Sequence, residues 1–177
     1  DISDDVLAWF RQPAFTRAFP TFPTPTSRAA LAQRLKRGRS GRVRHLFIWA
    51  QDRPIGLVIV EFLDRPGAVV QTHNFLGARA WWGQGVIHEA RAGLIEALFR
   101  SGALRVVGLP RSDNRAAVQT YRDQGFVQEG VLRDHYAHPD GGRADAVCFA
   151  VLRREWDYNR ARRLPPAVAR RRRARRS

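Results

Sequence analysis

Sulfur-containing residues are almost absent from this sequence. Its 177 residues include one cysteine, Cys148, and no methionine. A single cysteine excludes an internal disulfide and is typical of a reducing compartment, which predicts a cytoplasmic protein. The lack of an initiator methionine predicts that the chain is a processed protein or a fragment. Because the cysteine and the five histidines show no spacing typical of metal ligands, we expect no metal site.

Long apolar segments are also missing. The longest apolar runs, such as residues 55–60, are far shorter than the ~20 residues that a membrane-spanning helix requires. The first five residues contain three acidic side chains and no apolar segment follows them, which argues against a signal peptide. A chain of 177 residues that is 44% hydrophobic can bury one core and is short for two domains. We therefore expect one globular domain with no membrane contact.

Positive charge is what the sequence has in excess. There are 31 Lys and Arg residues against 16 Asp and Glu, a formal net charge of +15, and all but one of the cations are arginines. Nine of these arginines lie in residues 160–177, a segment without any acidic residue. Such a segment is predicted to be disordered on its own. It is either a contact for RNA or the ribosome through phosphate groups, or a solvated tail of an arginine-rich protein.

Helix and strand signals alternate along the chain. Helices come first, an antiparallel meander follows, and the chain then continues as strand, helix, strand, helix and a long hairpin. This order predicts a mixed α/β layered fold. The expected helices are residues 3–10, 28–37, 83–100 and 113–124, and the expected strands are residues 46–50, 55–62, 68–77, 104–109, 126–138 and 144–152.

A glycine-rich segment joins the third expected strand to the longest expected helix. It reads Trp82-Gly83-Gln84-Gly85-Val86. Glycine lets a ligand approach the backbone closely, and the start of a helix offers unpaired N–H groups and a positive dipole end. These properties suit a pyrophosphate. A tight turn would need the same glycines, so the segment alone does not decide between a binding loop and a simple turn.

A second segment makes the interpretation specific. Asn114, Ala117, Tyr121, Gly125 and Phe126 follow the pattern Asn-x-x-Ala-x-x-x-Tyr-x-x-x-Gly-Phe. Together with the glycine-rich segment, in that order and spacing, it resembles the acetyl-CoA motifs of the GNAT superfamily of N-acetyltransferases. The form is similar to that of the Rim-type subgroup, which resembles ribosomal-protein-alanine acetyltransferases. The likeness extends over residues 46–156.

This resemblance implies the fold class as well. The GNAT fold is an α/β (α+β) fold with a mixed, mostly antiparallel central sheet flanked by helices. We expect residues 1–157 to form this domain and residues 158–177 to form a disordered Arg-rich C-terminal tail. Because residues 3–6 resemble the start of the first helix of the family, we expect the first strand of the family to be missing from this chain.

Acetyl-CoA is the cosubstrate that the resemblance implies. The backbone amides of the glycine-rich segment would hold its pyrophosphate, and the end of the third strand would pair with the pantetheine arm as an added strand does. Asn114 would hydrogen-bond the pantetheine. Its alternative role is an N-cap, for which Asp113 is equally suited. The implied binding residues are Phe75, Leu76, Gly77, Trp82, Gly83, Gln84, Gly85, Val86, Asn114 and Tyr121.

The resemblance also implies catalytic residues. Tyr121 stands where many GNAT enzymes place the general acid that protonates the departing CoA thiolate, and a phenol carries its proton at neutral pH. The alternative is a half-buried aromatic residue on a packed helix. The amine must lose a proton before it attacks, and His73 and Glu61 are candidate bases. A chain of water molecules could replace either of them.

The acceptor stays open at this stage. The resemblance implies direct transfer of an acetyl group to a primary amine, either a protein N-terminal α-amine or a small amine metabolite. The expected substrate groove, residues 9–35 and 133–143, is basic, which disfavours a polycationic amine. The alternative function is a ribosome- or nucleic-acid-docking module with a CoA-binding but weakly active GNAT fold. The oligomeric state, monomer or dimer, is also open.

Overall fold

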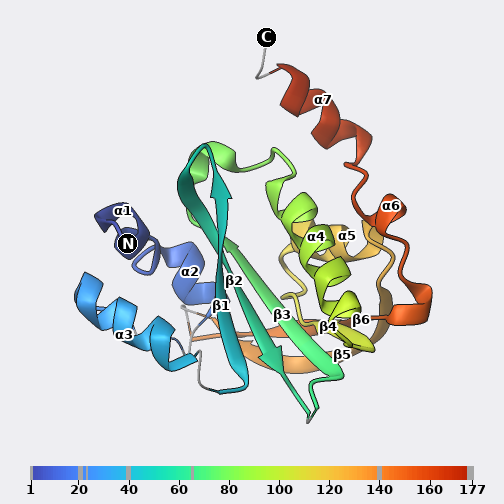
Figure 1. The fold of residues 1–177 in the computed structure, drawn as a ribbon, viewed down its shortest axis with the longest axis horizontal. Coiled ribbons are helices and arrows are strands. Elements are labelled where there is room, and N and C mark those ends of the chain that lie inside the picture. Colours follow the sequence, from blue (N-terminus) through green and yellow to red (C-terminus); the bar gives the residue numbers. More distant parts are fainter. Residues whose placement is uncertain are drawn as a thin grey trace.

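A six-stranded sheet forms the centre of the protein in the computed structural model (Figure 1), which describes residues 2–19, 22, 24–38, 41–64, 66–138 and 141–174. The strand order is β1-β2-β3-β4-β6-β5. Among the described strands β3 and β4 form the one parallel pair, and all other pairs are antiparallel. The strands are β1 (Val43–Ala50), β2 (Arg53–Phe62), β3 (Val69–Leu76), β4 (Arg105–Gly108), β5 (Val127–Ala137) and β6 (Arg143–Leu152). The predicted mixed, mostly antiparallel sheet is confirmed.

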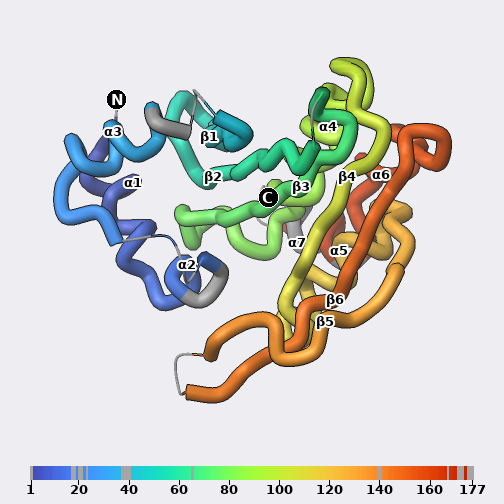
Figure 2. The backbone as a smooth tube through the Cα atoms, turned by 90° about the horizontal axis from the view of Figure 1, so that it is seen from below, coloured from blue at the N-terminus to red at the C-terminus, as the bar shows by residue number. Residues whose placement is uncertain are grey.

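Helices cover both faces of this sheet. Three N-terminal helices lie together on one side, and two further helices pack on the other side (Figures 1 and 2). Among the described residues, every helix is too short or too polar to cross a lipid bilayer. The first group is α1 (Asp4–Trp9), α2 (Pro13–Ala18) and α3 (Arg28–Gly38), and the second is α4 (Val86–Arg100) and α5 (Arg115–Asp123).

Strand β2 shows why the sequence contains an apolar run at this point. Its side chains alternate between the two faces of the sheet. Leu57 and Ile59 join the cluster under α1–α3, whereas Val58 and Val60 join the cluster under α4 and α5. Because both faces are covered, the strand is apolar along its length rather than alternating.

The local signals at helix ends and turns act as expected. The hydroxyl of Ser3 accepts a hydrogen bond from the Val6 N–H at 3.3 Å, and the hydroxyl of Ser27 accepts one from the Ala30 N–H at 3.1 Å. Each such N-cap stabilises its helix by about 1 kcal/mol. Gln51 and Asp52 have positive φ angles of 48° and 58°, which matches a two-residue hairpin turn with the twist of the strands it joins.

The C-terminal segment differs from the prediction of disorder. Residues 158–161 form helix α6 (Tyr158–Ala161), and residues 166–174 form helix α7 (Pro166–Ala174). Ala161 is fully buried, and the side-chain amide of Gln124 donates to the carbonyls of His88 and Ala161 at 2.7 and 3.5 Å. Apolar residues lie between the arginines, and two of them, Leu164 and Val168, lie close to Gly85 at the start of α4. Residues 175–177 lie outside the described residues.

Candidate active site

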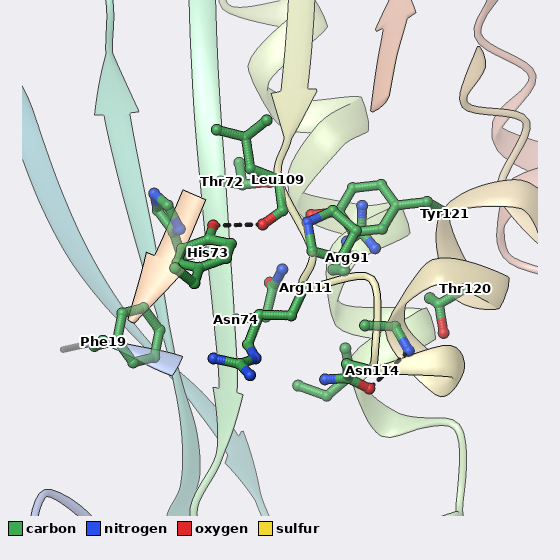
Figure 3. A pocket seen from close by; sticks show the side chains of 14 residues that line it. Phe19, Thr72, His73, Asn74, Arg91, Leu109, Arg111, Asn114, Thr120 and Tyr121 are labelled. Atoms are coloured by element: carbon green, nitrogen blue, oxygen red, sulfur yellow. Dashed lines mark hydrogen bonds between the residues drawn. The ribbon is translucent and has the colours of Figure 1, made fainter. Parts of the chain in front are cut away.

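The parallel pair of strands opens into a cleft. Strands β3 and β4 are paired only at Val69 with Arg105, Val70 with Val106 and Gln71 with Val107. Strand β3 then continues to Leu76, while β4 ends at Gly108 and the chain turns away. The β4-facing edge of residues 72–76 is therefore free of a neighbouring strand. A pocket of about 150 Å³ lies between the two strands at this point (Figure 3).

Residues of both sheet faces meet in this cleft. Successive side chains of β3 point to opposite faces. Thr72 and Asn74 lie on the face covered by α4 and α5, as the neighbouring Val70 does, and His73 lies on the face covered by α1–α3, as Phe75 does. The cleft is thus a passage through the sheet, with different chemistry available from each side.

Tyr121 forms the wall of the cleft on the α5 side. The side chain is only 5% exposed, and its ring stacks on Phe149 at 5.3 Å between centroids with an interplanar angle of 7°. Its hydroxyl lies directly above Gly108, because a Cβ atom built on that glycine would be 2.2 Å from the Tyr121 oxygen. Any side chain at position 108 would have to displace the phenol, so this glycine fixes the place of the hydroxyl at the cleft.

His73 and Glu61 come together on the opposite face. The register of β2 and β3 places Ile59 beside His73 and Glu61 beside Gln71, so Glu61 and His73 are diagonal neighbours. The His73 Nε2 atom lies 3.5 Å from the Glu61 carboxylate and 3.0 Å from the Gln71 amide nitrogen. Burial lowers the pKa of His73, and the charge of Glu61 opposes this shift in part. The imidazole is therefore neutral near pH 7 and able to accept a proton.

A second pocket lies on the His73 side of the sheet. It has a volume of about 530 Å³ and includes Glu61, Arg34 and Arg143 in its wall. Four residues, Phe19, His73, Leu109 and Tyr136, line both this pocket and the cleft. A molecule in the second pocket would therefore reach the cleft past His73.

The glycine-rich loop lies at the start of α4, outside the cleft. Gly83 and Gly85 have positive φ angles of 73° and 77°. Within the described residues, the N–H groups of Gly83, Gly85 and Val86 have no hydrogen-bond acceptor. The indole of Trp82 donates to the carbonyl of Leu76 at 2.9 Å, which fastens the loop to the end of β3. Free amides at a helix N-terminus form a suitable site for a phosphate group.

Asn114 has the N-cap role, and its contact with pantetheine stays a prediction. It is the N-cap of α5, and its Oδ1 atom accepts a hydrogen bond from the Ala117 N–H at 3.2 Å (Figure 3). Its side-chain NH2 group has no partner among the described residues, and Asn114 lines the cleft. Asp113, the other candidate cap, instead pairs with Arg111 through contacts of 2.7 and 3.0 Å. The cap therefore holds the Asn114 amide in place at the cleft.

The structure places the remaining predicted residues away from the cleft wall. The Phe75 ring packs edge-on against Phe15 at 5.0 Å, inside the N-terminal helix cluster. Gly77 faces Trp9, because a Cβ atom on this glycine would lie 2.1 Å from the Trp9 ring. Leu76 offers its carbonyl to Trp82. The predicted role of residues 75–77 depends on backbone groups, so it stays a prediction.

Sequence reasoning missed several residues of the cleft. Arg91 of α4 and Thr72 of β3 both line the cleft, and each is 2% exposed. Four apolar residues of α4 at helical spacing, Val86, Ala90, Leu94 and Leu98, are partly buried against the core. The fully buried positions of this helix are His88, Arg91, Ala92, Ile95 and Phe99. The helix also begins at Val86 rather than at Gly83. Two of the fully buried residues, His88 and Arg91, are polar, and the spacing of apolar residues alone does not reveal them.

Known proteins share both the sequence pattern and the fold. The acetyltransferase (GNAT) domain family matches residues 1–127, whereas no curated protein matches the chain. A probable acetyltransferase has 22% identity and a TM-score of 0.73, with 86% of this chain and 87% of that chain covered. A microcin self-immunity acetyltransferase in complex with acetyl-CoA and AMP has 20% identity, a TM-score of 0.70 and coverage of 84% and 86%.

A third solved structure has the same fold. It is a spermidine N-acetyltransferase chimera from Vibrio cholerae and hSSAT, with 17% identity, a TM-score of 0.71 and coverage of 87% and 91%. The family match spans most of this chain, including the glycine-rich loop, Asn114 and Tyr121. The chain therefore belongs to the GNAT family of acetyl-CoA-dependent N-acetyltransferases.

Proposed function

We propose that this chain transfers the acetyl group of acetyl-CoA to the amine of an acceptor that also carries a negative charge, such as the α-amine of a peptide or an amino acid. The observation that carries this choice is the composition of the second pocket. Arg34 and Arg143 line it, and Glu61 is the one acidic residue in its described wall. A pocket of this charge favours an anionic group and disfavours a polyamine. The Rim-type resemblance, with its protein α-amine acceptors, supports the same choice.

The two faces of the cleft divide the work of this proposed reaction. Acetyl-CoA supplies the thioester from the side of α4 and α5, with its pyrophosphate at the loop amides of residues 83–86. The acceptor amine comes from the second pocket, where His73 takes up a proton with Glu61 beside it. The amine nitrogen bonds to the thioester carbon and the carbon–sulfur bond breaks. Tyr121 donates its proton to the sulfur as the thiolate leaves.

The test of this function is CoA release with matched acceptors. A short peptide with a free α-amine and a free C-terminal carboxylate should react faster than the same peptide with an amidated C-terminus. We expect a difference of about two- to fivefold in kcat/KM, because an exposed ion pair contributes up to ~1 kcal/mol. Spermidine should react more slowly than both. If spermidine is the better acceptor, the proposed acceptor class is wrong. If acetyl-CoA binds and no amine releases CoA, the binding-module alternative gains support.

Asn114 offers a second test with a matched control. Serine at this position keeps an N-cap acceptor and loses the amide donor, so the Asn114→Ser variant should unfold at nearly the same temperature as the parent. We expect its Kd for acetyl-CoA in calorimetry to rise about three- to tenfold, the usual range for one lost hydrogen bond. Asn114→Ala should show the same loss of affinity and also lower the unfolding free energy by about 1 kcal/mol. Equal affinity of the serine variant and the parent would leave Asn114 with the capping role alone.

A further inference from the structure

A buried cation without an anion lies in the wall of the cleft. Arg91 on α4 is 2% exposed, and its Nε and Nη2 atoms have no hydrogen-bond partner among the described residues. It also forms no ion pair with any described residue. Burial lowers the pKa of Arg91, since the charged form loses its hydration there. A guanidinium in this state is costly for the fold, whereas a leucine could fill the same position in a helix.

The position of Arg91 relates it to Tyr121. Its guanidinium carbon lies 3.7 Å from the centroid of the Tyr121 ring, and Phe149 stacks on the opposite face of that ring. Figure 3 shows Arg91 and Tyr121 next to each other on the same side of the pocket. The phenol is therefore held between a cation and an aromatic ring. A cation at a ring face stabilises negative charge on that ring and on groups close to it.

The proposed reaction creates one negative charge at this place. When the carbon–sulfur bond breaks, its electron pair stays on sulfur, and the proton of Tyr121 moves to that sulfur. The anion is then either the thiolate or the phenolate that replaces it, until solvent returns the proton. Before the reaction the sulfur is part of the thioester and carries no charge. Arg91 thus has no anionic partner among the described residues and gains one when the thioester is cleaved.

We propose that Arg91, which lies against the ring of Tyr121, is the counter-charge for the negative charge that forms when the thiolate leaves. This inference rests on the proposed function, because it needs acetyl transfer with Tyr121 as the proton donor. The buried Arg91 then destabilises the fold and favours catalysis. Its attraction to the developing negative charge is stronger in the transition state than in the ground state, which is the requirement for a higher kcat. Thr72 and Asn74 also present unpartnered buried oxygens to the same pocket.

The first experiment separates Arg91 from the rest of the site by kinetics. Arg91→Met keeps the length of the side chain and removes its charge, and Arg91→Lys keeps the charge. We expect the methionine variant to lose about tenfold in kcat with the acetyl-CoA Kd changed less than threefold, and the lysine variant to lose less. In a Tyr121→Phe background the thiolate leaves without a proton, so the methionine substitution should lower kcat by at least the same factor. A methionine variant that keeps the kcat of the parent, or that loses kcat only together with affinity for acetyl-CoA, would overturn the inference.

The second readout needs no turnover. CoA and desulfo-CoA differ at the sulfur alone, and at pH 9 part of a free thiol is ionised. The parent should bind CoA about tenfold more tightly than desulfo-CoA in calorimetry, and Arg91→Met should lose this preference. An unchanged preference would overturn the inference while leaving acetyl transfer intact. If the parent neither binds acetyl-CoA nor releases CoA with any amine, the proposed function fails and the inference fails with it.

Discussion

Replacing Tyr121 with phenylalanine should lower kcat for acetyl transfer about 10²- to 10³-fold, within the range for loss of a general acid. The substitution removes one oxygen and keeps the ring between Phe149 and Arg91. We therefore expect the unfolding temperature and the Kd for acetyl-CoA to stay close to those of the parent. The measurements are CoA release under saturating acceptor, thermal unfolding, and calorimetric titration with acetyl-CoA.

Tyr136 is the matched control for this prediction. It lines the same cleft, and its hydroxyl already donates to the Leu109 carbonyl at 2.6 Å. Burial raises the pKa of Tyr136 to about 12, which makes it a weak proton donor. Tyr136→Phe should therefore cost about 1 kcal/mol of stability from the lost hydrogen bond and less than tenfold in kcat. A larger loss of kcat in Tyr136→Phe than in Tyr121→Phe would indicate that Tyr136, and not Tyr121, is the general acid.

The sequence was informative where local chemistry decides the structure. The glycines of the loop adopt the positive φ angles that only glycine adopts easily, and Ser3 and Asn114 cap the helices that follow them. These features depend on a few neighbouring residues, so they can be predicted from the local amino-acid sequence. The order of strands and helices along the chain also followed from local patterns of apolar, glycine and capping residues. This is why the fold class and the loop could be predicted.

The cleft itself could not be read from the sequence in the same way. Its opening depends on where β3 and β4 stop pairing, and these strands are separated in the chain by the whole of α4. The pairing of Glu61 with His73 depends on the register of β2 and β3. Both residues were candidates, and only the register brings them within 3.5 Å of each other. Long-range pairing thus decided which of several polar residues share the site.

Arg91 and the C-terminal helices show a different limit. An arginine inside an amphipathic helix is normally assigned to the solvent face, so a buried one goes against the pattern. The C-terminal segment was judged by its charge, although Leu164 and Val168 lie close to Gly85 at the start of α4. In both cases the rule that charged residues face the solvent holds for most residues and fails close to the proposed binding site. Departures of this kind are expected where function opposes stability.

Those contacts decide which glycine of the loop is suitable for a charge test. A Cβ atom on Gly85 would lie 2.5 Å from Leu164 and 3.0 Å from Val168, so a substitution there would disturb the C-terminal segment. Gly83 has open space around the same position, and its φ angle of 73° is tolerated best by asparagine and aspartate. Gly83→Asp and Gly83→Asn are therefore a matched pair that differs in charge and hardly in shape.

We expect Gly83→Asp to bind acetyl-CoA about ten- to a hundredfold more weakly than Gly83→Asn, with similar unfolding temperatures for the two variants. Two unit charges about 4 Å apart near a protein surface repel by ~4 kcal/mol, and partial exposure reduces this value. The difference should shrink as salt is raised, because salt screens charges at the surface. Calorimetry at two salt concentrations measures both effects. Equal Kd values for the two variants would place the pyrophosphate elsewhere, because a carboxylate beside the free amides of this loop would repel a phosphate bound there and weaken its binding.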